Sequence, residues 1–476
     1  MSQEKINWLE WDKKVFERAE REKKPILLDI FGKWCFWCHR QDSDTYENPA
    51  VIEVVNKEVV AVRVDTDKRP DINERYNQGG WPTTAFLDHQ GEVIAGATYL
   101  KPDQFLDMLE HAKHALGMRR PQREEQPPRR GVVTEEALLS LEDMARRAFD
   151  PVHGGFGEPK FPHPELLEFL LLRYRETGEK DLLGMVEKSL QGMIGGIYDP
   201  VEGGFYRYSV TQDWSLPHYE KMLDTNAGLV RVLALAYQQT KKELYLSPLR
   251  RTVAYLLATL ADQEGGFFAS QDADGEDQYY GKPLEERKKM ETPFIDKTVY
   301  ADLNGLALRG LLGFWKVDRG VGAFIEKTVG LLLEHFFSRE KGMVHYLENG
   351  RPVFLGLLRD QVNVALALME AGKTFGKKGW EEKARQLGEF IFKNFRDPEG
   401  GGFFDKLPGG EGRLAVREKR LGENVRAALL FLELGNEKIA EEALEVFALD
   451  WRAYGLLAGE YGVAVEMVLL GKKDIP

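Results

Sequence analysis

The sequence predicts two domains of different class: a small α/β domain, followed by an all-α toroid of six helical hairpins, an (α/α)6 arrangement. Short apolar segments alternate with helical ones up to residue 118, which predicts the α/β domain (1–118). Residues 119–133 contain three prolines and five arginines without apolar periodicity, which predicts a linker. Apolar residues then recur at helical spacing through 134–476, which predicts the toroid.

The composition of the 476 residues bounds the class of protein. The chain is 43% hydrophobic and 30% charged, carries a net charge of −12 and is too long for a single ordinary core. No apolar run approaches the roughly 20 residues that span a bilayer, and the N-terminus lacks a signal-peptide pattern. No basic stripe with interleaved aromatic residues is present. We therefore expect a cytoplasmic protein without membrane or nucleic-acid partners.

Both cysteines of the chain lie in one tetrapeptide, Cys35-Phe36-Trp37-Cys38. The apolar run 25–31 predicts a buried strand that leads through a short loop to a helix, with Cys35 at the helix start. Peptide N–H groups there favour the thiolate, which is the nucleophilic form of cysteine. Half of a zinc site is the alternative, but a second cysteine pair is missing and His39 is too close in sequence. The motif favours dithiol redox chemistry without a metal or cofactor.

The rest of the first domain carries a recognisable order of elements. Strands are predicted over 59–65, 83–88 and shortly after 91, and helices over 70–76 and 102–116. This βαβαββα order is that of thioredoxin. Together with the tetrapeptide, Arg69-Pro70-Asp71 and Gly79-Gly80-Trp81-Pro82 resemble the spermatogenesis-associated, thioredoxin-like protein family. Members of that family join such a domain to a helical one similar to N-acylglucosamine epimerases and six-hairpin glycosidases.

Four further residues complete the predicted redox site. The resemblance implies a cis peptide before Pro82, beside the thiols, where the proline would shape the substrate groove. Asp29 lies mid-strand among Leu and Ile, so burial should raise its pKa and make it a proton acceptor for Cys38. A structural carboxylate with satisfied hydrogen bonds is the alternative for Asp29. Trp37 and Trp81 are expected to offer substrate an apolar surface.

A glycine turn repeats through the second domain. Gly-Gly pairs ending at Gly155, Gly204, Gly266 and Gly402 each precede Phe, and a degenerate copy surrounds Gly342. Between the turns, apolar periodicity predicts twelve helices over residues 134–148, 164–176, 180–195, 223–239, 245–261, 300–315, 320–337, 358–373, 378–395, 422–434, 436–448 and 452–470. Twelve helices make six hairpins, which favours a closed ring over an open solenoid.

Acidic residues repeat at the starts of alternate helices, at Asp224, Asp302, Asp360 and Glu423, and each has an asparagine on the same turn. Simple helix capping explains the acids but not the asparagines, so a polar cavity is predicted at the inner-helix starts. Loop segments before these helices add candidate substrate-binding residues, namely Tyr206, Arg207, His218, Glu220, Asp272 and His345. A calcium loop at Asp272-Ala-Asp274-Gly is rejected because its later ligands are missing.

Three functions follow from these features. The first is a thiol–disulfide oxidoreductase that acts on a disulfide-bearing protein or a small thiol, with the toroid binding the substrate. The second is a carbohydrate-active toroid with a regulatory or vestigial redox domain. Glycosidase chemistry would use Glu220, Asp224 or Asp302, and epimerase chemistry would use His218 and His345. The third is a non-catalytic interaction platform.

Overall fold

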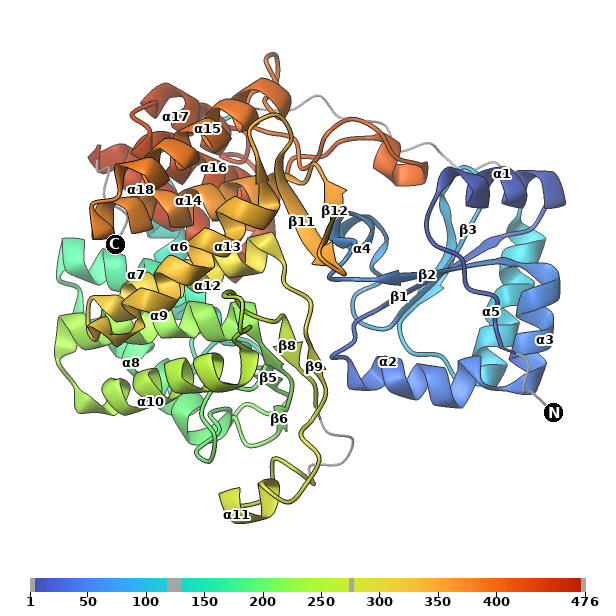
Figure 1. The fold of residues 1–476 in the computed structure, drawn as a ribbon, viewed down its shortest axis with the longest axis horizontal. Coiled ribbons are helices and arrows are strands. Elements are labelled where there is room, and N and C mark those ends of the chain that lie inside the picture. The colour runs from blue at the N-terminus through green and yellow to red at the C-terminus, as the bar shows by residue number, and fades with distance from the viewer. Residues whose placement is uncertain (1–4, 118–129, 274–277, 472–476) are drawn as a thin grey trace. The chain divides into compact units, whose positions relative to one another are not determined.

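The structure, a computed structural model, describes residues 5–117, 130–273 and 278–471 (Figure 1). It divides into two compact units. Unit 1 comprises Met1–Gln126 and Pro408–Arg417, and unit 2 comprises Pro127–Leu407 and Glu418–Pro476. Most of the predicted linker, residues 119–129, lies outside the described residues, as does Asp274.

Unit 1 has the predicted thioredoxin-like sheet. Its strands β1 (Ile26–Phe31), β2 (Val60–Asp65), β3 (Thr83–Leu87) and β4 (Val93–Ala97) lie in the order β2-β1-β3-β4. Strand β1 pairs parallel with β2 and antiparallel with β3, and β4 is antiparallel to β3. The predicted helices are α2 (Phe36–Gln41), α4 (Pro70–Tyr76) and α5 (Pro102–Ala115), and two that were not predicted are α1 (Lys13–Glu22) and α3 (Pro49–Glu58).

Helices cover both faces of this sheet. Side chains from α1 and α4 pack with Leu28 and Ile30 on one face, and side chains from α3 and α5 pack with Leu27 and Phe86 on the other. Strand β1 is therefore buried along nearly its whole length, which explains its continuous apolar sequence. This burial on both sides fixes the strand end that leads to Cys35.

A late segment of the chain completes the core of unit 1. Residues 408–417 pack with this unit, and Leu414 is buried among its apolar side chains. The Arg413 backbone N–H donates to the Tyr76 hydroxyl at 2.8 Å, and the Arg75 guanidinium donates to the carbonyls of Arg413 and Val416 at 3.2 and 3.1 Å. This segment belongs to the range predicted for the toroid, whereas the burial of Leu414 places it in unit 1.

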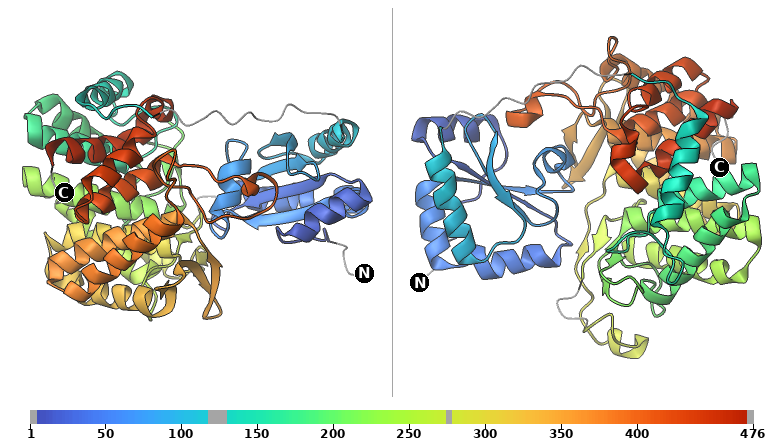
Figure 2. Two further views of the ribbon diagram at one scale, coloured as in Figure 1. Left: turned by 90° about the horizontal axis from the view of Figure 1, so that it is seen from above. Right: turned by 180° about the vertical axis from the view of Figure 1, so that it is seen from behind.

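Unit 2 is a closed ring of helices (Figures 1 and 2). The inner helices are α7 (Pro164–Thr177), α9 (Leu223–Thr240), α12 (Ala301–Trp315), α14 (Leu358–Phe375), α16 (Leu421–Glu433) and α18 (Gly459–Leu470). The outer helices are α6 (Glu135–Ala148), α8 (Lys180–Gly196), α10 (Glu243–Tyr255), α13 (Gly322–Leu331), α15 (Lys378–Asn394) and α17 (Glu437–Glu445). Each inner helix packs against the next, and α18 packs against α7. The predicted toroid is confirmed, and the open solenoid is excluded.

The asparagines of the helix starts hold the glycine turns. The Asn226 side chain accepts from the Phe205 N–H at 2.7 Å and donates to the Phe205 carbonyl at 3.0 Å. Asn304 and Asn424 form the same pair of bonds with the Phe that follows their own Gly-Gly turn. In the degenerate copy Gln361 binds Met343 in this way. These amides are structural and do not line a cavity, because both their polar atoms are used within the fold.

One stretch, Trp451–Leu470, has the length and composition of a membrane span, with a mean hydropathy of 1.4. The structure breaks it at Gly455, whose φ is 55°, and half of the stretch is buried. Its second part, α18, belongs to the inner ring, where Glu466 accepts from Arg173 at 2.7 Å. The apolar composition is therefore explained by packing in the toroid core.

Candidate functional site

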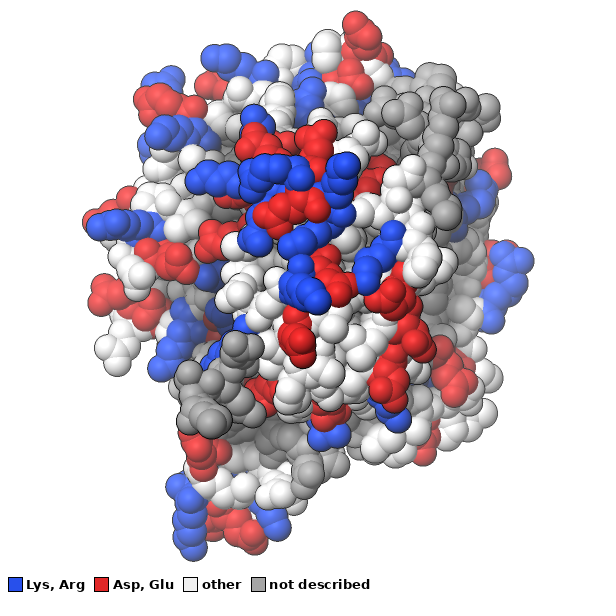
Figure 3. All heavy atoms as spheres, turned by 90° about the vertical axis from the view of Figure 1, so that its right-hand side faces the viewer, with Lys and Arg blue, Asp and Glu red and all other residues white. Residues whose placement is uncertain are grey.

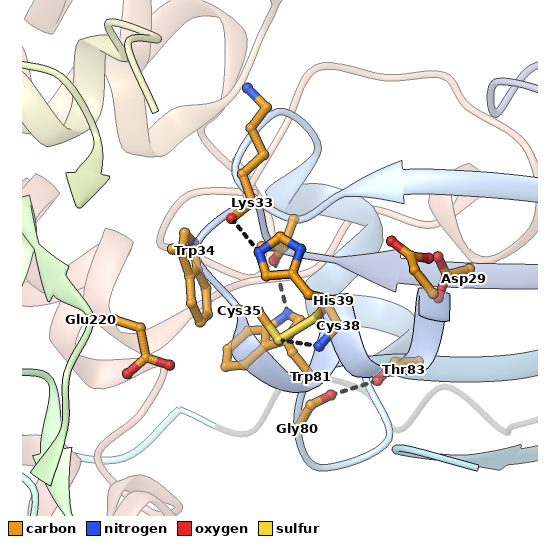
Figure 4. Close-up of a disulfide and its surroundings, with 12 residues drawn as sticks. Asp29, Lys33, Trp34, Cys35, Cys38, His39, Gly80, Trp81, Thr83 and Glu220 are labelled. Atoms are coloured by element: carbon orange, nitrogen blue, oxygen red, sulfur yellow. Dashed lines mark hydrogen bonds between the residues drawn. A yellow bond between two sulfur atoms is a disulfide. The ribbon is translucent and has the colours of Figure 1, made fainter. Parts of the chain in front are cut away.

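The two cysteines are joined in a disulfide at the start of α2 (Figure 4). Their Cα atoms are 5.2 Å apart, and both side chains are almost fully buried. Cys35 is the N-cap residue, and its Sγ accepts from the Cys38 backbone N–H at 3.1 Å. A thiolate formed at Cys35 on reduction would keep this N–H donor and the helix dipole as stabilising partners.

Aromatic side chains surround the disulfide. The Trp81–Pro82 peptide is cis, as the resemblance implies. The Trp81 ring meets the Trp34 ring edge-on at 5.4 Å, and its Nε1–H donates to Asn73 at 3.1 Å (Figure 4). Trp37 keeps 45% of its surface exposed and contacts Tyr99. Trp37 is therefore open to solvent, and the contact of Trp37 and Trp81 with a substrate stays a prediction.

Asp29 lies mid-strand in β1 with 1% of its surface exposed. Its Oδ2 is 3.0 Å from Arg63 Nε, an ion pair without hydrogen-bond alignment, and its Oδ1 accepts from the Tyr46 hydroxyl at 3.3 Å. Burial raises the pKa of Asp29 to about 7, although the Arg63 charge opposes the shift. The predicted rise in pKa is confirmed, and Arg63 is a partner that the sequence analysis missed.

In the toroid, Tyr206 belongs to a buried ionic cluster. Lys221 is fully buried, and its Nζ donates to Asp199 at 2.7 Å and lies 5.3 Å from the Tyr206 ring centre. Arg287 also donates to Asp199 at 2.7 Å. Lysines bind the aspartate of the glycine turn in two other copies, through the pairs Lys160–Asp150 and Lys419–Asp397. This repetition indicates a structural role for the cluster around Tyr206.

The residues beside Tyr206 form a short sheet. Arg207 and His218 pair through the backbone across β5 (Tyr208–Ser209) and β6 (Pro217–His218). The His218 ring stacks on Tyr208 at 4.3 Å, and its Nδ1 is 3.8 Å from Glu220. His218 therefore lies in the predicted loop segment, which contains this two-residue strand pair, and its role in substrate binding stays a prediction.

Three predicted site residues meet in one buried cluster. His345 Nδ1 lies 2.8 Å from Asp360 Oδ1 and 4.0 Å from Asp302 Oδ1. Arg359 Nε donates to Asp302 Oδ2 at 2.8 Å. Burial raises the pKa of Asp360, whereas Arg359 and His345 outweigh burial at Asp302 and lower its pKa.

His345 reaches this cluster from a strand and not from the predicted rim loop. It lies in β11 (Gly342–Glu348), which pairs with β12 (Arg351–Leu355).

The remaining predicted acids lie outside the cluster of Asp302, His345 and Asp360. Asp224 is exposed in the first turn of α9, Glu423 is buried in that of α16, and Asp272 follows β8 (Ser270–Gln271). The four acids of the helix starts therefore do not form a uniform ring.

The toroid axis carries ion pairs that the sequence analysis missed. Arg231 on α9 binds Glu168 at 2.9 Å and Glu370 at 3.3 Å. Arg426 on α16 binds Glu460 at 2.9 Å. A small cavity beside them is lined by Glu165, Glu168, Arg309, Leu429, Glu460 and Val463. One signal in the sequence could have revealed this network, namely charged residues in the middle of apolar helices. Arg231 and Arg309 are examples, and each lies seven residues after an acid of a helix start, Asp224 or Asp302.

Glu165, in the first turn of α7, combines an exposed side chain with surroundings that disfavour its charge. Glu165 also lines the small cavity that Glu460 lines. Burial and the neighbouring Glu460 raise the pKa of Glu165 to about 7. A carboxylic acid with this pKa can give or take a proton at neutral pH.

Fold and site together define the chain as a thioredoxin-like dithiol domain joined to an (α/α)6 toroid. Residues 1–127 match the family model described as "Protein of unknown function, DUF255". An uncharacterized protein of Caenorhabditis elegans is 32% identical over 302 residues, which cover 56% of this chain and 41% of that protein. Spermatogenesis-associated protein 20 of Homo sapiens is 27% identical over 321 residues, covering 59% and 40%.

The resemblance to the spermatogenesis-associated, thioredoxin-like proteins is therefore confirmed, and the match spans about two fifths of the length of these relatives. Among solved structures, cellobiose 2-epimerase from Bacillus thermoamylovorans matches 67% of this chain and 88% of its own. The TM-score is 0.52 and the identity 12%, so the two share the fold of the toroid.

On the face drawn in Figure 3, acidic and basic side chains lie interspersed.

Proposed function

We propose that the protein is a thiol–disulfide oxidoreductase. The observation that carries the proposal is the Cys35–Cys38 disulfide at a helix start, in the same domain as the cis Pro82. In the reduced protein the Cys35 thiolate attacks a substrate disulfide, forming a mixed disulfide and releasing one substrate thiolate. The Cys38 thiolate then attacks Cys35 Sγ, releases the second substrate thiolate and restores the intramolecular disulfide. Two electrons pass to the substrate, and a thiol reductant then reduces the Cys35–Cys38 disulfide for the next cycle.

Asp29 takes up the proton of the Cys38 thiol in this cycle. Its pKa of about 7 allows it to accept a proton at neutral pH and release it afterwards. Arg63 is the positioning residue, since its ion pair favours the carboxylate form and so limits the rise in pKa.

Substrate contacts begin at the exposed Trp37, which favours an apolar segment of a disulfide-bearing protein or a small thiol. The toroid supplies further substrate binding in this proposal. Because the chemistry needs reduced thiols at the start of each cycle, the proposed compartment is the reducing cytoplasm.

The test is reduction of insulin disulfides by the full chain with dithiothreitol as reductant. We expect Cys35→Ser to abolish the catalysed reaction and Cys38→Ser to accumulate a mixed disulfide with substrate, visible on a non-reducing gel. Both variants should unfold at a temperature close to that of the reduced wild type. Equal activity of wild type and folded Cys35→Ser would contradict the proposal.

A second candidate function is acid–base chemistry on a carbohydrate in the toroid, favoured by the accessible Glu165 with its pKa of about 7. The similar epimerase fold permits this reading but names no substrate for this chain. The test is incubation with cellobiose and mannose, followed by sugar analysis, for wild type and Glu165→Gln. Product formation that Glu165→Gln removes would support the candidate, and unchanged sugars would exclude it for these substrates.

A further inference from the structure

We propose that Asp302, His345 and Asp360 bind a divalent transition-metal ion within the toroid. These residues come from α12, β11 and α14, and the dithiol reaction uses none of them. Each offers one ligand atom, and the three atoms lie within 4.8 Å of one another. Separate elements thus deliver two carboxylate oxygens and one imidazole nitrogen to a single buried point.

Unpartnered oxygen atoms point to a missing ligand. Within the described part of the chain, Asp302 Oδ1 and Asp360 Oδ2 accept no hydrogen bond. Only 1% of Asp302 and 0% of Asp360 are exposed, so bulk water does not replace the missing donors. Buried carboxylate oxygens without partners are strongly disfavoured, and a bound cation would satisfy both.

The charge of the cluster points the same way. Asp302 and Asp360 carry two carboxylates, and the Arg359 guanidinium, which binds Asp302, can balance only one of these two negative charges. A proton on His345 or a metal ion bound to it would balance that charge. Tyr300, Tyr346 and Phe354 pack against the His345 ring, and this apolar shell strengthens the attraction of the cluster for a cation.

The donor set selects the class of ion. Mg²⁺ and Ca²⁺ prefer sites made of oxygen ligands, whereas one imidazole with two carboxylates suits Zn²⁺, Mn²⁺ or Fe²⁺. His345 Nδ1 and Asp302 Oδ1 are 4.0 Å apart, so small side-chain rotations bring both within about 2.1 Å of a shared ion. Water would fill the remaining positions.

The experiment uses the full chain with its disulfide intact, so that the thiols bind no metal. After removal of metal with a chelator, we expect one Zn²⁺ or Mn²⁺ per chain by calorimetry, a higher Tm with metal, and no comparable effect of Ca²⁺. Asp360→Asn and His345→Gln should each weaken binding at least tenfold. Asp224→Asn, which alters an exposed acid at the matching turn of α9, should bind as the wild type does.

A stripped wild type that takes up neither Zn²⁺ nor Mn²⁺ would overturn the proposal, as would folded Asp360→Asn and His345→Gln proteins that bind metal undiminished. If a variant fails to fold, a Co²⁺ titration of the metal-free wild type still tests the proposal. Visible d–d absorption of the Co²⁺ form, lost on adding Zn²⁺, supports the site, and a featureless spectrum refutes it. Loss of insulin reduction in Cys35→Ser would leave this result unaffected.

Discussion

At the scale of single residues, Asp29 shows how a buried charge sets both reactivity and stability. Its carboxyl group is held between the Arg63 charge and the Tyr46 hydroxyl inside the sheet. The mid-strand position among Leu and Ile was enough to predict burial and a raised pKa. Arg63 was harder to predict, because it lies in another strand and only the parallel register, which pairs Asp29 with Arg63, brings the two together.

Removal of the Asp29 charge should change how stability depends on pH. The folded pKa of about 7 exceeds the ordinary 3.8, so between these values the folded protein holds a proton that the unfolded chain has lost. The stability contribution of Asp29 is therefore full below about pH 4 and falls by about 4 kcal/mol as the pH rises through 7. Urea unfolding at pH 4 to 8 should show this fall in the wild type but not in Asp29→Asn. Parallel curves for the two proteins would contradict the assignment.

The same carboxyl group should control the rate of disulfide reduction. We expect Asp29→Asn to lower the insulin-reduction rate by about 10²-fold at pH 7, because Cys38 loses its proton acceptor. The wild-type rate should rise with pH through about 7 as the Asp29 carboxylate forms. Asp42→Asn, which removes another acid bound to Arg63, is the matched control and should keep most of the rate, with the rise moved to lower pH because the Asp42 charge contributes to the raised pKa of Asp29. If Asp29→Asn and Asp42→Asn lost the same share of the rate, the loss would be due to the disturbed Arg63 side chain and not to a missing proton acceptor.

At the scale of elements, the repeat joins each glycine turn to the helix that follows it. An amide side chain at the helix start grips the backbone of the turn in four places, through Asn226, Asn304, Gln361 and Asn424. The sequence revealed the repetition at the three asparagines but not at Gln361, and it did not reveal the purpose, because the partner atoms belong to the backbone. Amide side chains that line a polar cavity and amide side chains that bind the backbone of a turn produce the same sequence pattern.

Truncation of one clamp should destabilise the ring. Asn226→Ala removes two bonds to Phe205 and one to the Met222 carbonyl and leaves buried backbone groups unpaired, so we expect a loss of about 2–4 kcal/mol. Thr225→Ala, one residue away, removes a hydroxyl that bonds Asp224 and should cost less than about 0.5 kcal/mol. Chemical denaturation followed by far-UV circular dichroism measures both. Equal losses of unfolding free energy in Asn226→Ala and Thr225→Ala would contradict a special role for the Asn226 amide.

Most helix limits were predictable because apolar periodicity is strong in both layers of the ring. Strand β11 was not, since Gly342-Met-Val-His345 resembles a degenerate glycine turn and its pairing with β12 depends on a partner further along the chain. The meeting of His345 with Asp302 and Asp360 follows from that pairing, so the cluster was predictable as residues but not as a site.

At the scale of the whole molecule, the two units share the chain in an interleaved order. Residues 408–417 leave the sequence of the toroid to complete the core of unit 1. One boundary near residue 118 was predictable, but the second crossing was not, because a single leucine after a glycine-rich stretch has no periodicity. Tertiary packing alone decides where such a segment belongs.

Leu414→Ala should weaken unit 1 and leave the ring intact. Loss of a fully buried leucine costs about 2–4 kcal/mol, and here the loss falls on the core that contains Phe16, Ile72 and Tyr76. We expect faster hydrogen–deuterium exchange in β1 and β3, with no change in α9 or α12. Leu449→Ala, at an exposed position, is the control. Exchange that increases in the inner helices instead would contradict this assignment.

The placement of Leu414 also bears on how the chain is made. A ribosome must add nearly 300 residues after the dithiol domain has emerged before it reaches the segment that closes that domain, an interval of roughly 15–60 s. During that time the domain that carries Cys35 and Cys38 lacks one buried side chain of its core. The dithiol domain therefore waits through that whole interval for a side chain of its own core, although its sheet and its cysteines are already synthesised.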